Sequence, residues 1–271
     1  MVSARQENMS VFRTLVLLLL LLSPFPAADL PKQLDASYTI SYAFFDDIAE
    51  TTLRFESDGR RYRIVADAWL KGIAASLARH HREHHESEGI VTADGRLLPL
   101  HYRSVRRLDR FRMQRRYTFD HRHRQVLLTQ TVDRNVTKRT FDRHRLRWVE
   151  KTDTTRKTGH YRMNFYAKDD LLTLYFNARK LLAGREGKPL KIPAVGSRNG
   201  LVTLERIADI SAGGLLDSPA NALACRVLID QDIFRSKKGE LFVGLDANLL
   251  VNEAVLKDVF LFGDLHVRRK R

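Results

Sequence analysis

Apolar and polar residues alternate over most of the chain from Asp35 onward. One such repeat comprises Tyr38, Ile40, Tyr42 and Phe44, and another comprises Phe111, Met113, Tyr117 and Phe119, with Arg115 as its one exception. Because successive side chains of a strand point to opposite faces, a period of two indicates strands with one face on a core and one toward water. Antiparallel sheets have this character, so we expect a mainly β protein.

Turn signals divide this pattern into strands. Asp58-Gly59 and Asp94-Gly95 mark two tight hairpins, and Lys237 to Gly239 marks another. The expected strands comprise residues 38–44, 53–55, 62–64, 87–93, 97–103, 111–119, 125–132, 138–141, 145–150, 190–192, 201–207, 222–229, 240–245, 249–257 and 260–267.

The period changes once, over Lys168–Ala183. Its apolar residues recur three and four positions apart: Leu171, Leu174, Tyr175, Ala178, Leu181 and Leu182. Asp169 and Asp170 open the segment and Gly184 follows it, as is typical of a helix start and stop. The sequence therefore predicts one main helix among many strands.

Export is predicted from the N-terminus. An apolar run from Leu15 to Leu22 follows Arg13 and precedes small residues up to Ala28, as in a cleaved secretory signal peptide. The run has about half the length that a membrane-spanning helix needs. We expect residues 1–28 to be removed and residues 29–271 to form one periplasmic or otherwise exported domain, without an internal repeat.

The only cysteine is Cys225, which excludes an internal disulfide and an acylated cysteine near the signal. It lies in an apolar stretch from Ala222 to Ile229. We therefore expect a small buried hydrophobic residue and no reactive thiol.

Basic residues are concentrated in the middle of the chain. The 271 residues carry 47 Lys and Arg against 32 Asp and Glu, and residues 96–162 alone hold 20 basic and 6 acidic residues. These charges are explained either as solvated strand faces or as a surface that meets an anionic partner such as phospholipid headgroups. Sparse aromatic residues and the lack of a nucleic-acid-binding motif argue against nucleic acid.

Four histidines occur within six residues, at His80, His81, His84 and His85, together with Glu83 and Glu86. On a helix, histidines four residues apart could share a metal ion. On a strand they would lie about 13 Å apart, too far for one ion. The residues from Leu77 to Ile90 favour extended structure, so we predict a polar strand and no metal site.

Other sites of chemistry are not indicated. The chain has no Gly-x-Ser-x-Gly nucleophile motif, and the glycine clusters near Gly196 and Gly213 read as turns. Of the paired carboxylates, Asp46-Asp47 is predicted in a loop and Asp169-Asp170 at a helix N-terminus. We therefore expect no catalytic residues, no cofactor and no enzymatic activity.

Several segments resemble a known family. Tyr38 to Tyr42, Ala49 to Phe55, Gly59 and Tyr62 to Ile64 are similar to the opening hairpin of a bacterial periplasmic family called domain of unknown function 3108. Later matching segments are Gly72 with the strand after it, Ser87 to Ile90, Gly95 to Tyr102, and Asp169 to Phe176. The chain departs from the family pattern in its arginine and histidine content and at Asp246 to Val251.

The resemblance implies a single curved antiparallel sheet, a half-barrel or open barrel wrapped around one main helix, as in periplasmic lipoprotein carriers. It implies no activity. An apolar concavity under the helix is where an acyl chain could sit. We therefore hypothesise a monomeric carrier or chaperone of a lipidic or hydrophobic anionic ligand, with helix 168–183 as lid or plug. The alternative is an envelope structural or interaction protein that docks an acidic partner through a basic strand face.

Overall fold

The computed structural model describes residues 31–42, 45–144, 146–182, 185–197, 200–228, 240–247, 250–259 and 263–270. Several sequence predictions lie outside these residues: the signal peptide, the turn at Lys237 to Gly239 and the helix stop at Gly184.

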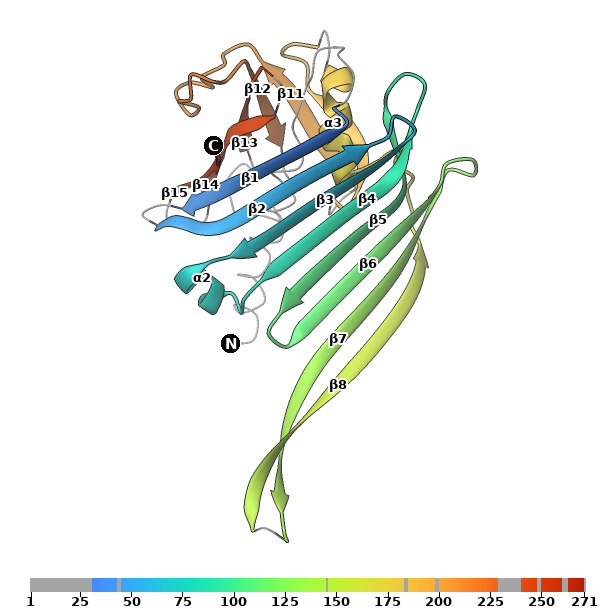
Figure 1. The fold of residues 1–271 in the computed structure, drawn as a ribbon, viewed down its shortest axis with the longest axis vertical. Helices are drawn as coiled ribbons and strands as arrows, with labels where there is room; N and C mark the ends of the chain where they lie inside the picture. The colour runs from blue at the N-terminus through green and yellow to red at the C-terminus, as the bar shows by residue number, and fades with distance from the viewer. Residues whose placement is uncertain are drawn as a thin grey trace.

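The described chain is mainly β, as predicted, and its strands form one open sheet (Figure 1). Neighbouring strands are antiparallel except for β9 and β10, which are parallel. The sheet has 15 strands in the order β8-β7-β6-β5-β4-β3-β2-β1-β15-β14-β13-β12-β11-β10-β9. The strands are β1 (Gln33–Tyr42), β2 (Phe45–Ser57), β3 (Arg61–Leu70), β4 (Arg82–Val91), β5 (Leu97–Leu108), β6 (Phe111–Asp120), β7 (Gln125–Asp142), β8 (Arg147–Arg162), β9 (Asp169–Asp170), β10 (Leu190–Val195), β11 (Leu201–Ile207), β12 (Leu223–Leu228), β13 (Glu240–Leu245), β14 (Val251–Val259) and β15 (Gly263–Arg269).

One long-range pairing joins two runs of sequential strands. Strands β1 to β8 follow one another in the sheet, and so do β10 to β15. The first strand β1 pairs with the last strand β15, with Ile40 opposite Val267. Both residues are buried, so this seam belongs to the hydrophobic core.

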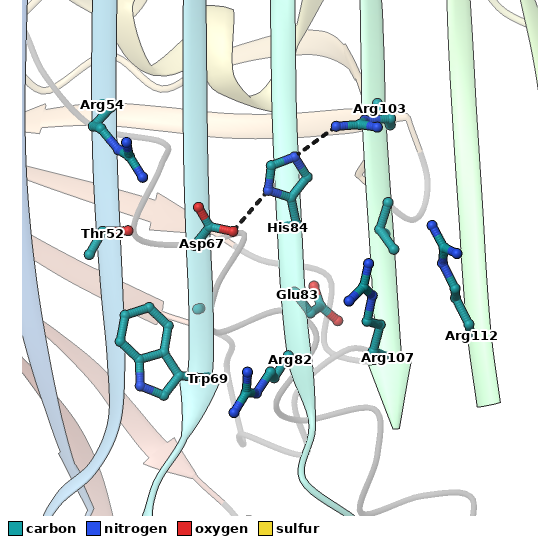
Figure 2. Close-up of a pocket in the computed structure, with 12 residues that line it drawn as sticks. Thr52, Arg54, Asp67, Trp69, Arg82, Glu83, His84, Arg103, Arg107 and Arg112 are labelled. Atoms are coloured by element: carbon teal, nitrogen blue, oxygen red, sulfur yellow. Dashed lines mark hydrogen bonds and ion pairs between the residues drawn. The ribbon is translucent and has the colours of Figure 1, made fainter. Parts of the chain in front are cut away.

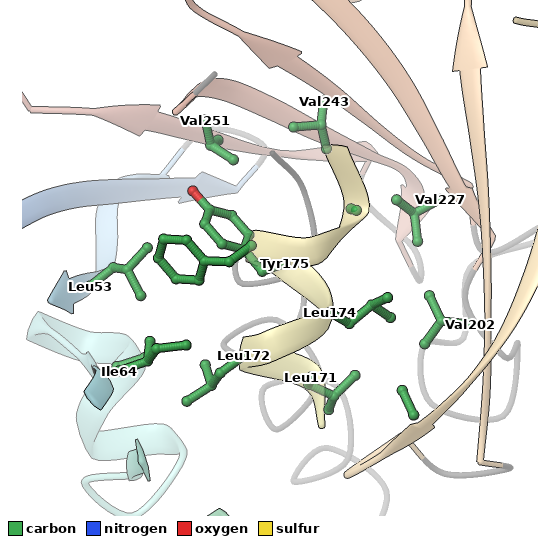
Figure 3. Packing of buried hydrophobic residues seen from close by; sticks show 14 of the residues in the cluster. Leu53, Ile64, Leu171, Leu172, Leu174, Tyr175, Val202, Val227, Val243 and Val251 are labelled. Carbon is green, nitrogen blue, oxygen red and sulfur yellow. The ribbon is translucent and has the colours of Figure 1, made fainter. Parts of the chain in front are cut away.

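The main helix, α3 (Leu171–Leu182), fills the space between the two runs. It contacts β4 and β5 from the first run and β10 and β11 from the second. All eight side chains from Leu171 to Ala178 are buried, and the Phe176 ring lies 4.6 Å from that of Phe55 on β2. Figure 3 shows Leu172 and Tyr175 of the helix among the buried side chains of the core. A helix buried all round is a core element. The helix predicted as lid or plug over residues 168–183 is therefore part of the core, and its side chains lie in the concavity of the sheet.

Some predicted boundaries are wrong. Residues 125–132 and 138–141 belong to one strand, β7, and the strand predicted at 145–150 continues to Arg162. Exposed threonines and charged residues on both faces hide this long hairpin from a search for hydrophobic alternation. A short helix, α2 (Gly72–Leu77), precedes β4, so the residues from Leu77 to His81 are not extended. Asp46 and Asp47 lie within β2 and not in a loop.

The hairpin of β7 and β8 extends beyond its neighbour. Strand β6 pairs with β7 only as far as Arg134, whereas β7 and β8 remain paired as far as Asp142 and Arg147. Figure 1 shows the resulting two-stranded arm projecting from the sheet.

Candidate anion-binding groove

The strand alternation gives the sheet an outer face opposite α3. A groove of about 720 Å³ lies on this face. Its lining comes from five consecutive strands: Thr52 and Arg54 on β2, Asp67, Ala68 and Trp69 on β3, Arg82, Glu83 and His84 on β4, Arg103, Val105 and Arg107 on β5, and Arg112 on β6 (Figure 2).

A row of cations crosses this groove. Trp69 lies opposite Arg82, Arg82 opposite Arg107, and Arg107 opposite Arg112, on four neighbouring strands. Figure 2 shows the side chains of this row together in the groove. Like charges directly opposite each other on adjacent strands destabilise a sheet. The row is therefore a local cost to stability that an anion in the groove would relieve.

The charges of this arginine row are not neutralised by neighbouring carboxylates. Among the described residues, Arg82 and Arg107 form no ion pair. Arg112 lies opposite Asp133, but that carboxylate already binds Arg156 at 2.6 Å. The row thus leaves positive charge free to bind a ligand.

In the neighbouring part of the groove, by contrast, carboxylates do neutralise the positive charge. His84 Nδ1 lies 2.8 Å from Asp67 Oδ1, and Arg103 lies 3.1 Å from His84 Nε2 and 2.6 Å from Glu86. Since a guanidinium only donates, His84 Nε2 accepts and its Nδ1–H donates to Asp67. Burial raises the pKa of Glu86, but the hydrogen bond from Arg63 and the charge of Arg103 outweigh it and lower the pKa.

A second surface hollow of similar volume, about 720 Å³, lies near the hairpin turn of β2 and β3. Its lining contains Glu56, Asp58 and Glu88 beside Arg61 and Arg63. With Lys32 added, three cations face three carboxylates, so the lining of this hollow carries no net charge, whereas five arginines face two carboxylates in the first groove.

The histidine cluster divides between the two faces of the sheet. His84 faces the outer groove, whereas His81 and His85 lie inside and each places Nε2 near Glu83, at 2.9 and 3.0 Å. His85 Nδ1 also lies 2.8 Å from the Tyr102 hydroxyl. Burial raises the pKa of Glu83, but hydrogen bonds from both histidines outweigh this and lower the pKa to about 2.

This buried network stabilises the sheet and is closed to substrates. The cavity beside it, which reaches Arg106 and Arg115, measures about 20 Å³, roughly the room of one water molecule. The prediction of a polar strand is confirmed from Arg82 onward. The part of the chain that the structure describes contains no group of three or more His, Cys, Asp or Glu side chains placed to hold a metal ion.

The paired carboxylates of residues 169 and 170 anchor the helix, as predicted. Asp170 Oδ1 accepts hydrogen bonds from the backbone N–H groups of Leu172 and Thr173 at 2.8 and 2.9 Å, which caps α3. Its other oxygen accepts the hydroxyl of Ser87 on β4 at 2.6 Å. Burial raises the pKa of Asp170 to about 7. Asp169 forms an ion pair with Arg96, which ties the same helix start to the strand β5 region.

Cys225 is buried on β12, as predicted. Burial raises the pKa of its thiol to about 12. The thiolate is the reactive form of cysteine, so this residue is a packing element.

The sequence analysis missed the arginine row. The turn at Asp94-Gly95 fixes the register of β4 and β5, and the turn between Leu108 and Phe111 fixes that of β5 and β6. Counting outward from the second turn places Arg107 opposite Arg112, but counting from the first turn would place Arg82 opposite Arg106 and not Arg107. The bulge between Glu88 and Gly89 shifts the first count by one residue, and the sequence does not reveal it.

The comparisons with known proteins place part of this chain in a family. The family model described as protein of unknown function (DUF3108) matches residues 37–146. This range holds most of β1, all of β2 to β7 and every residue that lines the groove. The resemblance predicted from the sequence is therefore confirmed for this range, and the chain carries a DUF3108 domain. No curated protein and no solved structure matches the chain.

The family assigns no activity, so function must be argued from the groove. Within the described residues, no helix combines the length and the apolar character needed to cross a membrane.

Proposed function

We propose that the chain is an exported, non-enzymatic protein that binds an anionic ligand with an apolar part in the groove on its outer face. The observation that carries this proposal is the row of Arg82, Arg107 and Arg112, whose mutual repulsion an anion would relieve.

The groove supplies the two kinds of contact that an anionic amphiphile needs. Guanidinium groups bind carboxylates and phosphates through paired, charge-assisted hydrogen bonds. Trp69 and Val105 offer apolar surface beside them. The volume of about 720 Å³ lies within the range of small-molecule pockets. A phospholipid headgroup with its first acyl carbons, or a fatty carboxylate, has this chemistry, and we propose it as the ligand class.

The second candidate is an interaction protein that docks an acidic partner on the same face. It is favoured by Arg54 and Arg116, two further arginines on the outer face. A docked polymer would be held mainly by charge and released by salt. An amphiphile in contact with Trp69 would retain part of its binding at high ionic strength.

The export that forms part of this proposal rests on residues 1–28. It is tested by the intact mass of the protein recovered from its own cells. A mature chain that begins within a few residues of Asp29, in the soluble exported fraction, supports it. A full-length chain in the cytosol contradicts it.

Ligand binding is tested by calorimetric titration with dihexanoyl phosphatidylglycerol, which is short enough to remain monomeric, against the zwitterionic phosphatidylcholine analogue. We expect saturable binding of the anionic lipid alone. The double variant Arg82→Gln with Arg107→Gln should bind at least tenfold more weakly, since a hydrogen bond to a charged group contributes about 1.5–3 kcal/mol.

A matched control replaces two exposed turn arginines outside the groove, Arg60→Gln with Arg122→Gln, and should leave the affinity unchanged. Equal binding of both lipids, or equal loss in both double variants, contradicts the proposal. Binding of polyglutamate without binding of either lipid would support the second candidate.

A further inference from the structure

Within the part of the chain that the structure describes, the distal arm of β7 and β8 has neither a third strand nor a core. Eight residue pairs, from Asn135 opposite Thr154 to Asp142 opposite Arg147, lie beyond the last partner on β6. At about 3.3 Å per residue this ribbon extends roughly 26 Å (Figure 1). A two-stranded hairpin alone is at best marginally stable in water. An arm of this length is therefore only marginally stable unless it contacts another molecule or a surface.

The tip of the arm exposes large apolar side chains. The exposed fractions are 42% for Phe141, 78% for Leu146 and 57% for Trp148. Phe141 and Trp148 lie opposite each other and pack edge to face, with ring centroids 5.4 Å apart. The Arg139 guanidinium lies 5.3 Å from the Trp148 ring centroid. Phe141 and Trp148 thus form a small apolar surface held by their mutual contact, and Leu146 is exposed in the turn between their strands.

Basic residues surround this apolar tip. Residues 138–151 contain six Lys or Arg and two Asp or Glu. Lys138, Arg143 and Arg147 are exposed. The tip thus combines positive charge with an aromatic pair and a leucine.

We infer that the tip of this arm, Phe141, Leu146 and Trp148 with the basic residues around them, docks on the surface of an anionic phospholipid bilayer. Tryptophan favours the boundary between headgroups and acyl chains, where its ring is apolar and its N–H is solvated. Arginine and lysine side chains place apolar stems in this boundary and charges among the phosphates. Each basic residue near an anionic membrane surface contributes about 1 kcal/mol. A bilayer therefore complements both the charge and the apolar surface of the tip.

The two tryptophans allow this inference to be tested apart from the groove. The chain contains only Trp69, in the groove, and Trp148, in the tip. In Trp69→Phe protein, all tryptophan emission comes from Trp148. We expect vesicles of equal parts phosphatidylglycerol and phosphatidylcholine to shift this emission to the blue, and lipids brominated on the acyl chain to quench it. Vesicles of phosphatidylcholine alone should do neither.

Charge reversal in the tip supplies the variant. Lys138→Glu, Arg143→Glu and Arg147→Glu together, in the Trp69→Phe background, should weaken vesicle binding at least tenfold. Three reversals away from both the tip and the groove, Arg60→Glu, Arg122→Glu and Lys188→Glu, form the matched control and should retain most of it. Leu146→Asp adds a single change at an exposed turn position and should also reduce binding.

Far-ultraviolet circular dichroism verifies that each variant is folded. Emission unchanged by anionic vesicles, or a tip variant that binds as well as the parent, overturns the inference. A shift produced by polyglutamate and not by vesicles also overturns it and assigns the arm to an acidic macromolecule. None of these outcomes depends on ligand binding in the groove, so the two proposals fail separately.

Discussion

Arg82 on β4 lies directly opposite Arg107 on β5, and among the described residues neither forms an ion pair. One residue further along β4, Glu83 lies opposite Arg106, which brings opposite charges together on the inner face. At these two neighbouring positions, the sheet therefore pairs unlike charges on its inner face and like charges in the outer groove. Such a like-charge pair lowers the stability of the fold. We therefore assign it to ligand binding, in which an anion would relieve the repulsion.

Replacing one member of the arginine pair should separate stability from binding. Arg107→Glu converts repulsion into attraction, which should stabilise the fold by up to about 1 kcal/mol. A gain of this size raises Tm by about 2–4 °C in a chain of this length. Binding of the anionic lipid should fall at least tenfold in the same variant. Arg122→Glu, at an exposed turn, corrects for the change in net charge. A lower Tm or unchanged binding in Arg107→Glu contradicts the assignment.

Asp170 should make the fold less stable as pH rises through neutrality. Its pKa is about 7 in the folded protein and close to the ordinary value of 3.8 when unfolded, so between these values the folded state holds a proton that the unfolded state lacks. Stability is therefore greatest below pH 4 on this account and is lost up to about pH 7, by on the order of 4 kcal/mol. Urea unfolding of Asp170→Asn at a series of pH values should show a flatter profile. Asp217→Asn, at the surface, should leave the slope unchanged.

Glu83 changes the stability of the fold with pH in the opposite direction to Asp170. Its pKa falls from the ordinary 4.5 to about 2 on folding, so its contribution is present above pH 4.5 and is lost as pH falls through 2. Glu83→Gln should lower stability at pH 7 by about 1–3 kcal/mol, since two buried histidine N–H groups lose a charged acceptor. It should also flatten the acid limb between pH 4.5 and 2. Glu88→Gln, exposed on the same strand, is the control; equal effects of the two changes would show that the buried network contributes nothing.

Gly196 is expected to tolerate no side chain. Its φ is +102°, and a Cβ there would lie 2.8 Å from Leu171 Cδ1 and 3.0 Å from Tyr102 Cε1. Gly196→Ala should therefore cost both backbone strain, about 1–3 kcal/mol, and a displacement of the helix start. Gly187 has φ +66° with nothing within 4 Å of a Cβ, so Gly187→Ala carries strain alone. If chemical denaturation gives the same loss for both, Gly196 does not hold α3 against β5.

The core was predictable from sequence where local pattern and burial agree. Period-two alternation located β11 and β13 at their observed bounds, and Asp170 marked the start of α3 because a capping carboxylate is a local signal. The long strands β7 and β8 were divided and shortened because their distal arm buries nothing. Without burial, an antiparallel ribbon has no hydrophobic period to detect.

The groove could not be predicted because it depends on register. Which arginines face each other follows from pairing three strands and from a bulge at Gly89, where a Cβ would lie 2.1 Å from the Leu98 carbonyl oxygen. The depth to which α3 is buried could not be predicted for a related reason. Amphipathic spacing indicated a helix with one apolar face, whereas Thr173 and Asn177 are buried too, through hydrogen bonds to Asp170 and Leu97. In the sequence, polar residues that form their hydrogen bonds inside the core cannot be distinguished from polar residues on a solvent-exposed face.

Trp69 allows the central claim to be measured in the groove itself. In Trp148→Phe protein, the remaining tryptophan borders Arg82, so a ligand bound to the arginine row must alter its emission. We predict a saturable change on titration with dihexanoyl phosphatidylglycerol, none with the phosphatidylcholine analogue, and loss of the change when Arg82→Gln and Arg107→Gln are introduced. Emission that both lipids alter equally, or that neither alters, would contradict the assignment of this groove as an anion-binding site.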